Sequence, residues 1–440
     1  MCINYDVLII GTGVGGLYTG CNLRDDIKTL IITKDKLRHC NSYLAQGGIS
    51  TLRNINDTEE FISDTLKAGN YKNNVDAVKE VVKNSTENIE KLIELCVNFD
   101  RNIDELNYTR EGGHSKFRIV HSKDETGKEV VEKLIKYIYT KKNITVLEEA
   151  TLLDIVEYEN KCIGGVIKYN DEVITVNSKV TVIATGGIGG IFNSTTNIEN
   201  ITGDGLCIAL NHNISMKDME YLQLHPTVLY EKNVKGRKLL LSESLRGEGG
   251  VIRNIAGVKF VNPLLPRDVV STEILNEIAK TPSTPYVYLD MTLKSKEFLV
   301  NRFPYIYSEC LSRGYRMEVD LLPIAPAHHY CMGGINVDLL SRTSMKNLYA
   351  VGEVSCTGVH GSNRLASNSL LEGLVFSKNA AENINLLMEE NMESVSNDLI
   401  ETLDNKARVF VEDRNICYKN RFVSYLKGKV DNRYVKLFNC

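Results

Sequence analysis

The sequence predicts an α/β protein with a doubly wound parallel sheet, a smaller domain inserted into it and a short helical tail. Residues 5–10 form a strand-like segment that runs into G-T-G-V-G-G at 11–16 and then into a helix-compatible segment, 17–23. Two later apolar segments, 180–185 and 347–351, also run into glycines. Buried parallel strands are typically continuous apolar runs of this kind. The polar, Pro- and Gly-rich region between the last two indicates an inserted domain.

Length and charge limit the possible functions. At about 150 residues per domain, 440 residues correspond to two or three domains. Lys and Arg number 52 against 56 Asp and Glu, for a net charge of −4, which argues against a nucleic-acid binder that works through bulk positive charge. The eleven cysteines include no C-x-x-C pair, so we expect neither an iron–sulfur cluster nor a zinc site.

The same features predict the compartment. The first apolar run, residues 7–10, is too short for a signal peptide or a membrane span. Scattered cysteines without a secretion signal are typical of buried thiols in a reducing cytosol. We therefore expect a cytoplasmic protein without membrane association.

The glycines at 11–16 indicate a Rossmann-like dinucleotide site. Gly11 permits a tight turn, Gly13 lets the backbone approach a pyrophosphate, and Gly16 permits close packing of helix on strand. The free N–H groups of the following helix then bind the phosphate charge. One position departs from the pattern, because the second predicted strand, 29–33, ends at Lys34 where an acidic residue normally meets the ribose.

Three strand ends in one doubly wound sheet can share one extended ligand. The sequence therefore favours a two-ended cofactor such as FAD. The predicted FAD-binding domain consists of residues 1–217 and 331–393, interrupted by an α+β capping domain at 218–330. Residues 394–440 form the predicted helical tail.

The inserted region and its flanks carry arginines and histidines beside Pro and Gly. Guanidinium and imidazole groups are suited to binding a small dicarboxylate. The candidates are His225, Arg246, Arg267, His328, His329 and Arg364.

Short motifs spread over residues 4–390 carry a resemblance to a known family. They include A-Q-G-G-I at 45–49, H-P-T at 225–227, R-G-E-G at 246–249, P-R-D at 266–268 and G-S-N-R-L-A-S-N-S-L-L-E at 361–372. The chain resembles the flavoproteins of the succinate dehydrogenase, fumarate reductase and L-aspartate oxidase family.

Two stretches resemble the L-aspartate oxidase branch. One is R-E-G-G-H-S at 110–115, followed by R-I-V-H at 118–121 and D-E-T-G at 124–127. The other is Asn41, which stands where succinate dehydrogenases and membrane fumarate reductases place a flavin-linked histidine. Asparagine cannot form that bond, so the resemblance implies non-covalent FAD.

The resemblance implies a set of site residues. Those implied or predicted to bind FAD are Gly11, Thr12, Gly13, Val14, Gly15, Gly16, Lys34, Asn41, Ser42, Tyr43, Leu44, Ala45, Gln46, Gly47, Gly48, Asp204, Glu353, Ser369 and Leu370. Those implied to contact the substrate are Glu111, His225, His329, Arg364 and Ser367. Arg267 is the implied proton-transfer residue, although a guanidinium is so rarely neutral in proteins that a purely electrostatic role remains open.

The implied reaction moves a hydride from the α-carbon of L-aspartate to flavin N5, giving iminoaspartate. Glu111 would attract the substrate ammonium, and a helix beginning near Asn368, with Ser367 or Asn368 as its cap, would aim its positive end at the flavin. Oxygen or fumarate would accept the electrons, and quinolinate synthase would take the imine towards NAD. The alternatives are a soluble fumarate reductase or succinate oxidase of the same family and, remotely, a non-catalytic or RNA-associated FAD-binding protein.

Overall fold

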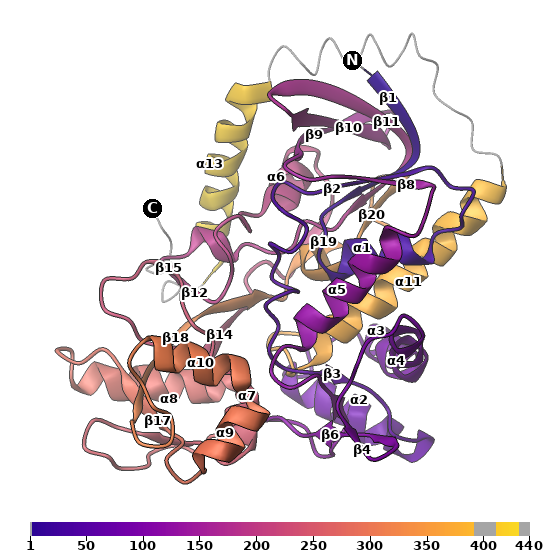
Figure 1. Ribbon diagram of the computed structural model, residues 1–440. Coiled ribbons are helices and arrows are strands. Elements are labelled where there is room, and N and C mark those ends of the chain that lie inside the picture. Colours follow the sequence, from indigo (N-terminus) through magenta and orange to yellow (C-terminus); the bar gives the residue numbers. More distant parts are fainter. Residues whose placement is uncertain (1, 391–410, 431–440) are drawn as a thin grey trace.

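The computed structural model describes residues 2–390 and 411–430, without the side chains of 411–417. Its larger sheet has seven strands in the order β8-β2-β1-β11-β10-β9, with β20 also paired to β11 (Figure 1). Their bounds are β1 Cys2–Ile10, β2 Thr29–Ile32, β8 Ile144–Leu147, β9 Thr151–Tyr158, β10 Lys161–Tyr169, β11 Glu172–Ile183 and β20 Leu348–Ala350. The pairs around β1 and between β11 and β20 are parallel.

Both faces of this sheet are covered, as the continuous apolar run in β1 predicts. Val7 and Ile9 enter one hydrophobic cluster, and Leu8 and Ile10 enter another on the opposite face. The first cluster contains side chains of α1 (Val14–Asn22), α5 (Thr126–Ile138) and α11 (Asn368–Glu389). The second contains side chains of α6 (Asp204–Asn211) and α13 (Val411–Lys429).

The carboxyl ends of three parallel strands lie side by side. Ile10 of β1 pairs with Ile183 of β11, and Ile183 pairs with Ala350 of β20. Gly11 follows β1 with φ +116°. This is the edge of a doubly wound sheet at which ligands bind.

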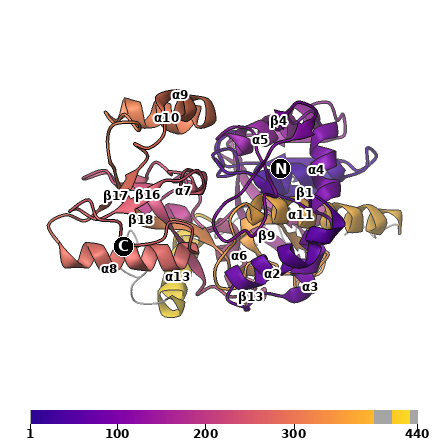
Figure 2. The same cartoon turned by 90° about the horizontal axis from the view of Figure 1, so that it is seen from below.

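The smaller sheet has six strands and its own hydrophobic core. Its order is β15-β12-β18-β17-β16, with β14 also paired to β18. The strands are β12 Ser194–Thr195, β14 Leu222–Leu229, β15 Gly236–Arg237, β16 Val251–Arg253, β17 Val287–Asp290 and β18 Leu322–Cys331. The helices are α7 Glu243–Gly247, α8 Arg267–Lys280, α9 Lys296–Arg302 and α10 Pro304–Ser312. Viewed from below, this part, here named the cap, lies beside the part that carries the larger sheet (Figure 2).

A third group of elements contributes further side chains to the first hydrophobic cluster. It comprises α2 Thr58–Ala68, α3 Val75–Lys83, α4 Ser85–Glu94, β3 Ile49–Ser50, β6 Tyr108–Thr109 and β7 Ile119–Val120. The short strands β3, β7 and β6 form one antiparallel sheet. They hold the segment that contains Glu111 against the start of α11, through contacts described below.

The expected helical tail is represented by α13, which packs on α6 (Figure 1). Phe422 is buried, and its ring lies 2.9 Å from the position that a Cβ would take on Gly203, the residue before α6. The rest of that expectation, at 394–410 and 431–440, lies outside the described residues.

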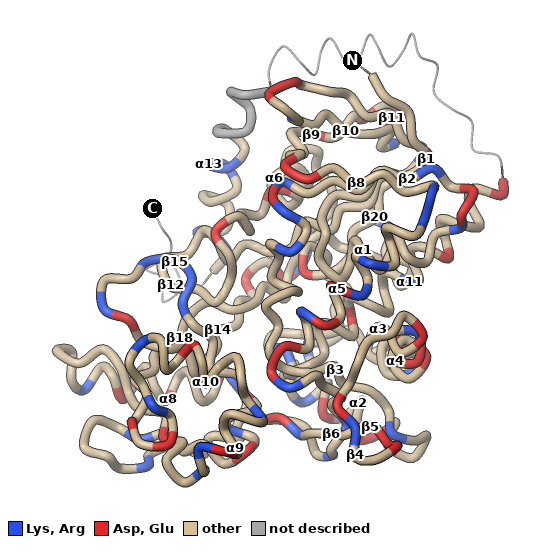
Figure 3. Tube along the Cα trace, in the orientation of Figure 1, with Lys and Arg blue, Asp and Glu red and all other residues tan. Residues whose placement is uncertain are grey.

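Charges of both signs are interspersed along the described chain (Figure 3). Among the described helices, none is both long enough and apolar enough to cross a membrane.

Candidate active site

Two adjoining cavities lie at the carboxyl ends of β1, β11 and β20. The first, here named the dinucleotide cavity, is lined by the glycine turn, Lys34, Thr185, Asn200 and Asp204, and its space is about 850 Å³. The second, here named the central cavity, lies between this region and the cap and holds about 1130 Å³, part of it open to solvent. Gly15, Asn41, Ser42, Gly352 and Glu353 line both cavities, so one extended ligand can occupy the two.

The dinucleotide cavity fits the adenosine and pyrophosphate end of FAD. Gly16 packs so tightly that a Cβ would lie 2.0 Å from the carbonyl oxygen of Gly11, which brings the start of α1 against the turn. A Cβ on Gly352, at φ +71°, would have the Cα of Gly15 as its nearest neighbour at 4.0 Å and would project into the space. Thr185 Oγ1 and Asn200 Oδ1 are buried without a hydrogen-bond partner among the described residues, so a polar ligand could satisfy both.

Lys34 has a partner that the sequence pattern did not indicate. Its Nζ lies 2.7 Å from Asp204 Oδ2 and donates to Thr202 Oγ1 at 3.1 Å. Burial opposes ionisation of Asp204, but the charge of Lys34 outweighs it and holds the pKa of that carboxyl below its usual value. An acidic group therefore does stand at this edge, although it comes from the start of α6 rather than from the end of β2.

Asn41 occupies the junction of the two cavities with both of its amide atoms engaged. Its Nδ2 donates to Asn197 Oδ1 at 2.8 Å, and its Oδ1 accepts from the N–H of Ile198 at 3.1 Å. Ser42 Oγ accepts from the N–H of Val14 at 3.1 Å. The segment after β2 is thus tied to the start of α1 and to the residues that follow β12.

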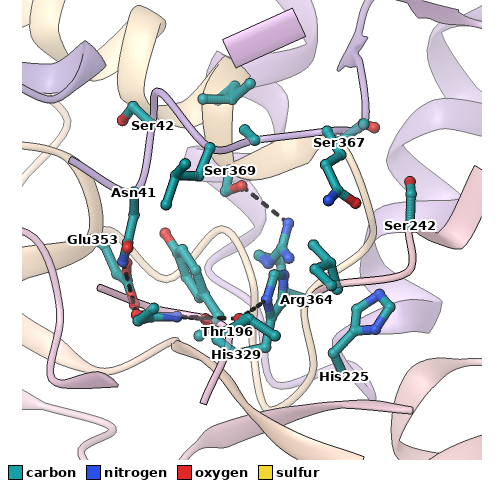
Figure 4. A pocket seen from close by; sticks show the side chains of 18 of the residues that line it. Asn41, Ser42, Thr196, His225, Ser242, His329, Glu353, Arg364, Ser367 and Ser369 are labelled. Atoms are coloured by element: carbon teal, nitrogen blue, oxygen red, sulfur yellow. Dashed lines mark hydrogen bonds between the residues drawn. The ribbon is translucent and has the colours of Figure 1, made fainter. Parts of the chain in front are cut away.

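The central cavity is lined by cationic and imidazole side chains from both parts of the molecule. His225 comes from β14, His329 from β18 and Arg267 from the first turn of α8. Arg364 comes from the loop before α11. Figure 4 shows His225, His329, Arg364 and Ser367 around the same space.

The two histidines lie on paired strands, with their ring centroids 5.0 Å apart. Burial and the charge of Arg267 lower the pKa of both rings well below the usual value, so both are neutral at neutral pH. His225 Nδ1 accepts from the N–H of Thr227 at 3.3 Å. Its proton therefore resides on Nε2, as a hydrogen-bond donor that carries no full charge.

Arg364 is positioned by contacts on two sides. Its Nη1 donates to Ser369 Oγ at 3.0 Å, and its guanidinium lies 4.7 Å from the centre of the Tyr330 ring. Its Nε is buried without a partner among the described residues. Burial, with the charge of Arg267, lowers the pKa of Arg364 to about 10, so it remains a cation that an anionic ligand would complete.

Arg267 is held by two acceptors in the cap. Its Nε donates to Glu243 Oε2 at 2.6 Å, and its Nη1 donates to Gln223 Oε1 at 2.9 Å. Burial opposes ionisation of Glu243, but Arg246 and Arg267 outweigh it and keep the pKa of the carboxyl below its usual value. Arg267, Glu243 and Arg246 therefore form one buried charge cluster, of which Arg267 and Glu243 line the central cavity.

Glu111 also lines the central cavity. It is buried, its Oε1 accepts from Ser244 Oγ at 2.8 Å, and its Oε2 accepts from Ser367 Oγ at 2.7 Å. The carboxylate therefore bridges the cap, through α7, and the start of α11.

The structure brings nearly all predicted residues to the two cavities. The exceptions among the predicted FAD residues are Gly16, which packs under the glycine turn, and Tyr43, whose hydroxyl donates to Glu132 at 3.1 Å. Two other candidates have different partners. The ring of His328 stacks on that of Phe192 with their centroids 4.0 Å apart, and Arg246 Nη2 pairs with Glu243 Oε1 at 3.1 Å. Neither lines either cavity.

The hydrogen bonding at the N-terminus of α11 differs from the expectation. The helix begins at Asn368 as predicted, and Ser367 takes the N-cap position at φ +63°. Its hydroxyl, however, donates to Glu111 and makes no cap hydrogen bond. Ser369 and Leu370 of the first turn line the central cavity, so the positive end of α11 points towards it.

Sequence reasoning missed Gln223, Glu243 and Ser244. Glu243 begins a five-residue helix, which has too few residues to show a periodic pattern. The sequence offered one indication of Glu243. It lies three residues before the candidate Arg246, a spacing that puts both side chains on one face of a helix.

The comparisons with known proteins identify relatives of the whole chain. The chain matches the FAD binding domain family over residues 6–370. It is 50% identical over 438 residues to the L-aspartate oxidase of Clostridium acetobutylicum, covering 99% of this chain and 100% of that protein. It is 48% identical to the L-aspartate oxidase of Clostridium perfringens, covering 88% and 89%. Among solved structures, a quinol fumarate reductase of E. coli matches with a TM-score of 0.87 and 28% identity, covering 94% of this chain and 75% of that chain.

Proposed function

Because the chain belongs to the L-aspartate oxidase family of FAD-binding flavoproteins, we propose that it oxidises L-aspartate to iminoaspartate in the central cavity. It is an FAD-dependent oxidoreductase. When bound, FAD supplies the acceptor for the hydride that leaves the substrate α-carbon. The remaining chemistry is done by the side chains that bind and orient the substrate.

The FAD-holding residues are those of the two cavities. The glycine turn and the N-terminus of α1 take the pyrophosphate, and Lys34 with Asp204 marks the adenosine end. Since Asn41 offers no nucleophile and both its amide atoms are engaged, the FAD is held reversibly. Denaturation in the absence of protease should release all flavin into solution, and flavin that stays with the precipitated chain would contradict this.

The substrate carboxylates are bound by Arg364 and the two neutral histidines. Arg364 supplies the charge, and its unpartnered Nε supplies a directed donor. His225 and His329 add donors without more positive charge. Holding both carboxylates orients the α-C–H bond, which is the main contribution that a protein can make to this reaction.

Glu111 recognises the ammonium group. Glu111 favours aspartate over a dicarboxylate without an amine, because a ligand without an amine has no positive charge to pair with this buried carboxylate. Ser244 and Ser367 stabilise the charged carboxylate in the cavity.

Arg267 acts electrostatically in aspartate oxidation, since Glu243 and Gln223 hold its guanidinium at the wall of the central cavity. In the opposite direction, with fumarate as electron acceptor, it is placed to donate a proton. Oxygen or fumarate takes the electrons, and quinolinate synthase consumes the imine in NAD synthesis, in the cytoplasm.

The observation that carries the proposal is the convergence of Arg267, Arg364, two neutral histidines and the Glu111 carboxylate on a cavity that shares lining residues with the dinucleotide cavity. The test is anaerobic mixing of the holoprotein with L-aspartate or succinate, followed by the absorbance of oxidised flavin. We expect rapid bleaching with L-aspartate and little with succinate. Bleaching by succinate alone would instead assign a succinate oxidase, and no bleaching by either would overturn the proposal. Reoxidation by oxygen and by fumarate, compared as rates, would then rank the acceptors.

A further inference from the structure

The segment 110–121 contributes Glu111 to the site, and His114 and Arg118 of the same segment are buried next to it in the chain. We infer that His114 and Arg118 are positioning residues that hold the Glu111 carboxylate against Ser367 and so give the cavity its preference for an amine-bearing dicarboxylate. This inference rests on the proposed function, because it assumes that Glu111 meets the substrate ammonium.

Glu111 and His114 are the two ends of one tight turn. The N–H of His114 donates to the carbonyl of Glu111 at 3.2 Å, and Gly113 has φ +84°. The turn is closed on one side by the cap, since a Cβ on Gly112 would lie 2.3 Å from Glu243 Oε1. The backbone of Glu111 therefore moves with His114.

The His114 ring connects this turn to the start of α11. Its Nε2 lies 2.9 Å from the carbonyl oxygen of Ala366 and must donate, because a carbonyl only accepts. Its Nδ1 then accepts from Arg118 Nη1 at 3.2 Å. Burial lowers the pKa of His114, which favours this neutral form with both nitrogens satisfied.

Ala366 directly precedes Ser367, whose hydroxyl donates to Glu111. The His114 contact with Ala366 therefore fixes the spacing between the two backbones that the Glu111–Ser367 hydrogen bond joins. Ser367 itself is held at φ +63°, with its carbonyl accepting from Ser50 N–H at 3.2 Å. A hydrogen bond between two side chains keeps its geometry only if both backbones are fixed.

Arg118 anchors the assembly to α2 and the turn before it. Its side chain is completely buried; Nε and Nη2 donate to both oxygens of Asp57 at 3.0 and 2.8 Å, and Nη1 donates to Asp64 at 2.5 Å. Its guanidinium also lies 4.9 Å from the centre of the Phe61 ring. Asp64 in turn accepts from the N–H and hydroxyl of Ser115.

The carboxylate-binding residues also have attachments outside the segment 110–121. His225 and His329 belong to β14 and β18 of the cap sheet. Arg364 is held by Ser369 and Tyr330, and its carbonyl accepts from Gln223 Nε2 at 2.9 Å. Loosening the turn should therefore weaken amine recognition and leave dicarboxylate binding intact.

The test uses holoprotein with His114→Met, which keeps the volume but removes the donor, and His114→Gln, whose amide can still donate to Ala366. We expect His114→Met to raise the KM for L-aspartate about ten-fold or more, as expected for losing one buried hydrogen bond. The dissociation constant of succinate, titrated against the flavin spectrum, should change less than about two-fold. His114→Gln should recover most of the aspartate KM.

His121→Met is the matched control. It removes a second buried histidine from the same segment, one that pairs with Asp100 at 3.1 Å and makes no contact with the turn. Its Tm should fall, while the ratio of aspartate KM to succinate dissociation constant should not change. Asp64→Asn provides a milder variant should His114→Met fail to fold.

The outcomes separate the two claims. If wild-type protein is not reduced by L-aspartate, the proposed function fails, whatever the variants do. If wild type is reduced but His114→Met and Asp64→Asn shift aspartate and succinate equally, or not at all, the positioning role is overturned.

Discussion

Arg267 donates to Glu243 and Gln223 with different nitrogens, so its position depends on the planar fork of a guanidinium. We expect Arg267→Lys to lower kcat for L-aspartate about 100-fold or more, because an ammonium cannot reproduce both contacts and the charge position. The free energy of unfolding should fall by only about 1 kcal/mol. Steady-state kinetics and urea denaturation measure the two effects.

Arg253→Lys is the control for this substitution. Arg253 pairs with Asp290 at 2.7 Å in the cap and lines neither of the two cavities. It should leave kcat unchanged. Turnover of Arg267→Lys at the level of this control would remove Arg267 from the mechanism.

Glu353 predicts a pH dependence of stability in the apoprotein. Desolvation raises the pKa of its carboxyl to about 7, so the folded state binds a proton that the unfolded state has released above about pH 4.5. The stability contributed by this group is complete below about pH 4.5 and is lost as the pH rises through 7. Glu353→Gln should therefore gain stability relative to wild type by of order 1 kcal/mol between pH 5 and 8, by urea denaturation. An unchanged difference between the two proteins over that range would contradict the raised pKa.

Individual residue types were predictable where a motif fixes their backbone, as at Gly11, Arg364 and Ser367. Their partners were not. Glu243 comes from a helix of five residues, and the Lys34–Asp204 pair joins residues 170 positions apart. Such contacts depend on how strands and the cap are placed in three dimensions, which no local pattern encodes.

At the scale of elements, the position of α1 depends on Gly16, where the helix backbone packs against Gly11 of the glycine turn. In Gly16→Ala the new Cβ would lie 2.0 Å from the carbonyl oxygen of Gly11, so the helix must move away from β1. We expect this variant to purify with little flavin, measured as the flavin-to-protein ratio. Gly428→Ala in α13, where a Cβ meets nothing within 4 Å, should keep the wild-type ratio. Full flavin content in Gly16→Ala would refute the close packing.

The helix α13 contributes stability through buried side chains. Phe422 and Leu426, together with Val430 just after the helix, are buried in the cluster that covers one face of the larger sheet. Phe422→Ala should lower the free energy of unfolding by about 3 kcal/mol, through lost burial and the cavity left behind. Leu386→Ala, at a side chain 59% exposed on α11, should change it by less than about 0.5 kcal/mol. Equal effects of both variants would show that α13 does not dock as described.

In the larger sheet, β1, β2, the end of β11 and β20 were predictable because each is a short apolar run, whereas β8, β9 and β10 were not predicted. The docking of α13 was not, since a charged, helix-compatible tail does not specify which surface it covers. The N-terminus of α11 shows the same limit. Its first residue was predicted, but the hydroxyl of Ser367 donates to Glu111, which lies 256 positions away in the sequence.

At the scale of the whole molecule, the site exists only where the cap meets the part that carries the larger sheet. His225, Arg267 and Ser244 come from the cap, whereas Glu111, Arg364 and Ser367 come from the other part. Resemblance to a family indicated all of these residues except Ser244, but their meeting around one cavity is a property of the assembled fold. Substrate recognition therefore depends on how the cap is placed relative to the part that carries the larger sheet.

The central claim is that the α-C–H bond of L-aspartate is broken in this cavity, and its most direct test is a stopped-flow comparison of L-aspartate with its 2-deuterated form under anaerobic conditions. If the carboxylates and the ammonium are held so that this bond faces the flavin, bleaching of the oxidised flavin should be severalfold slower with deuterium at the α-carbon. Identical bleaching rates at saturating concentrations of both substrates, or the absence of bleaching, would contradict the account.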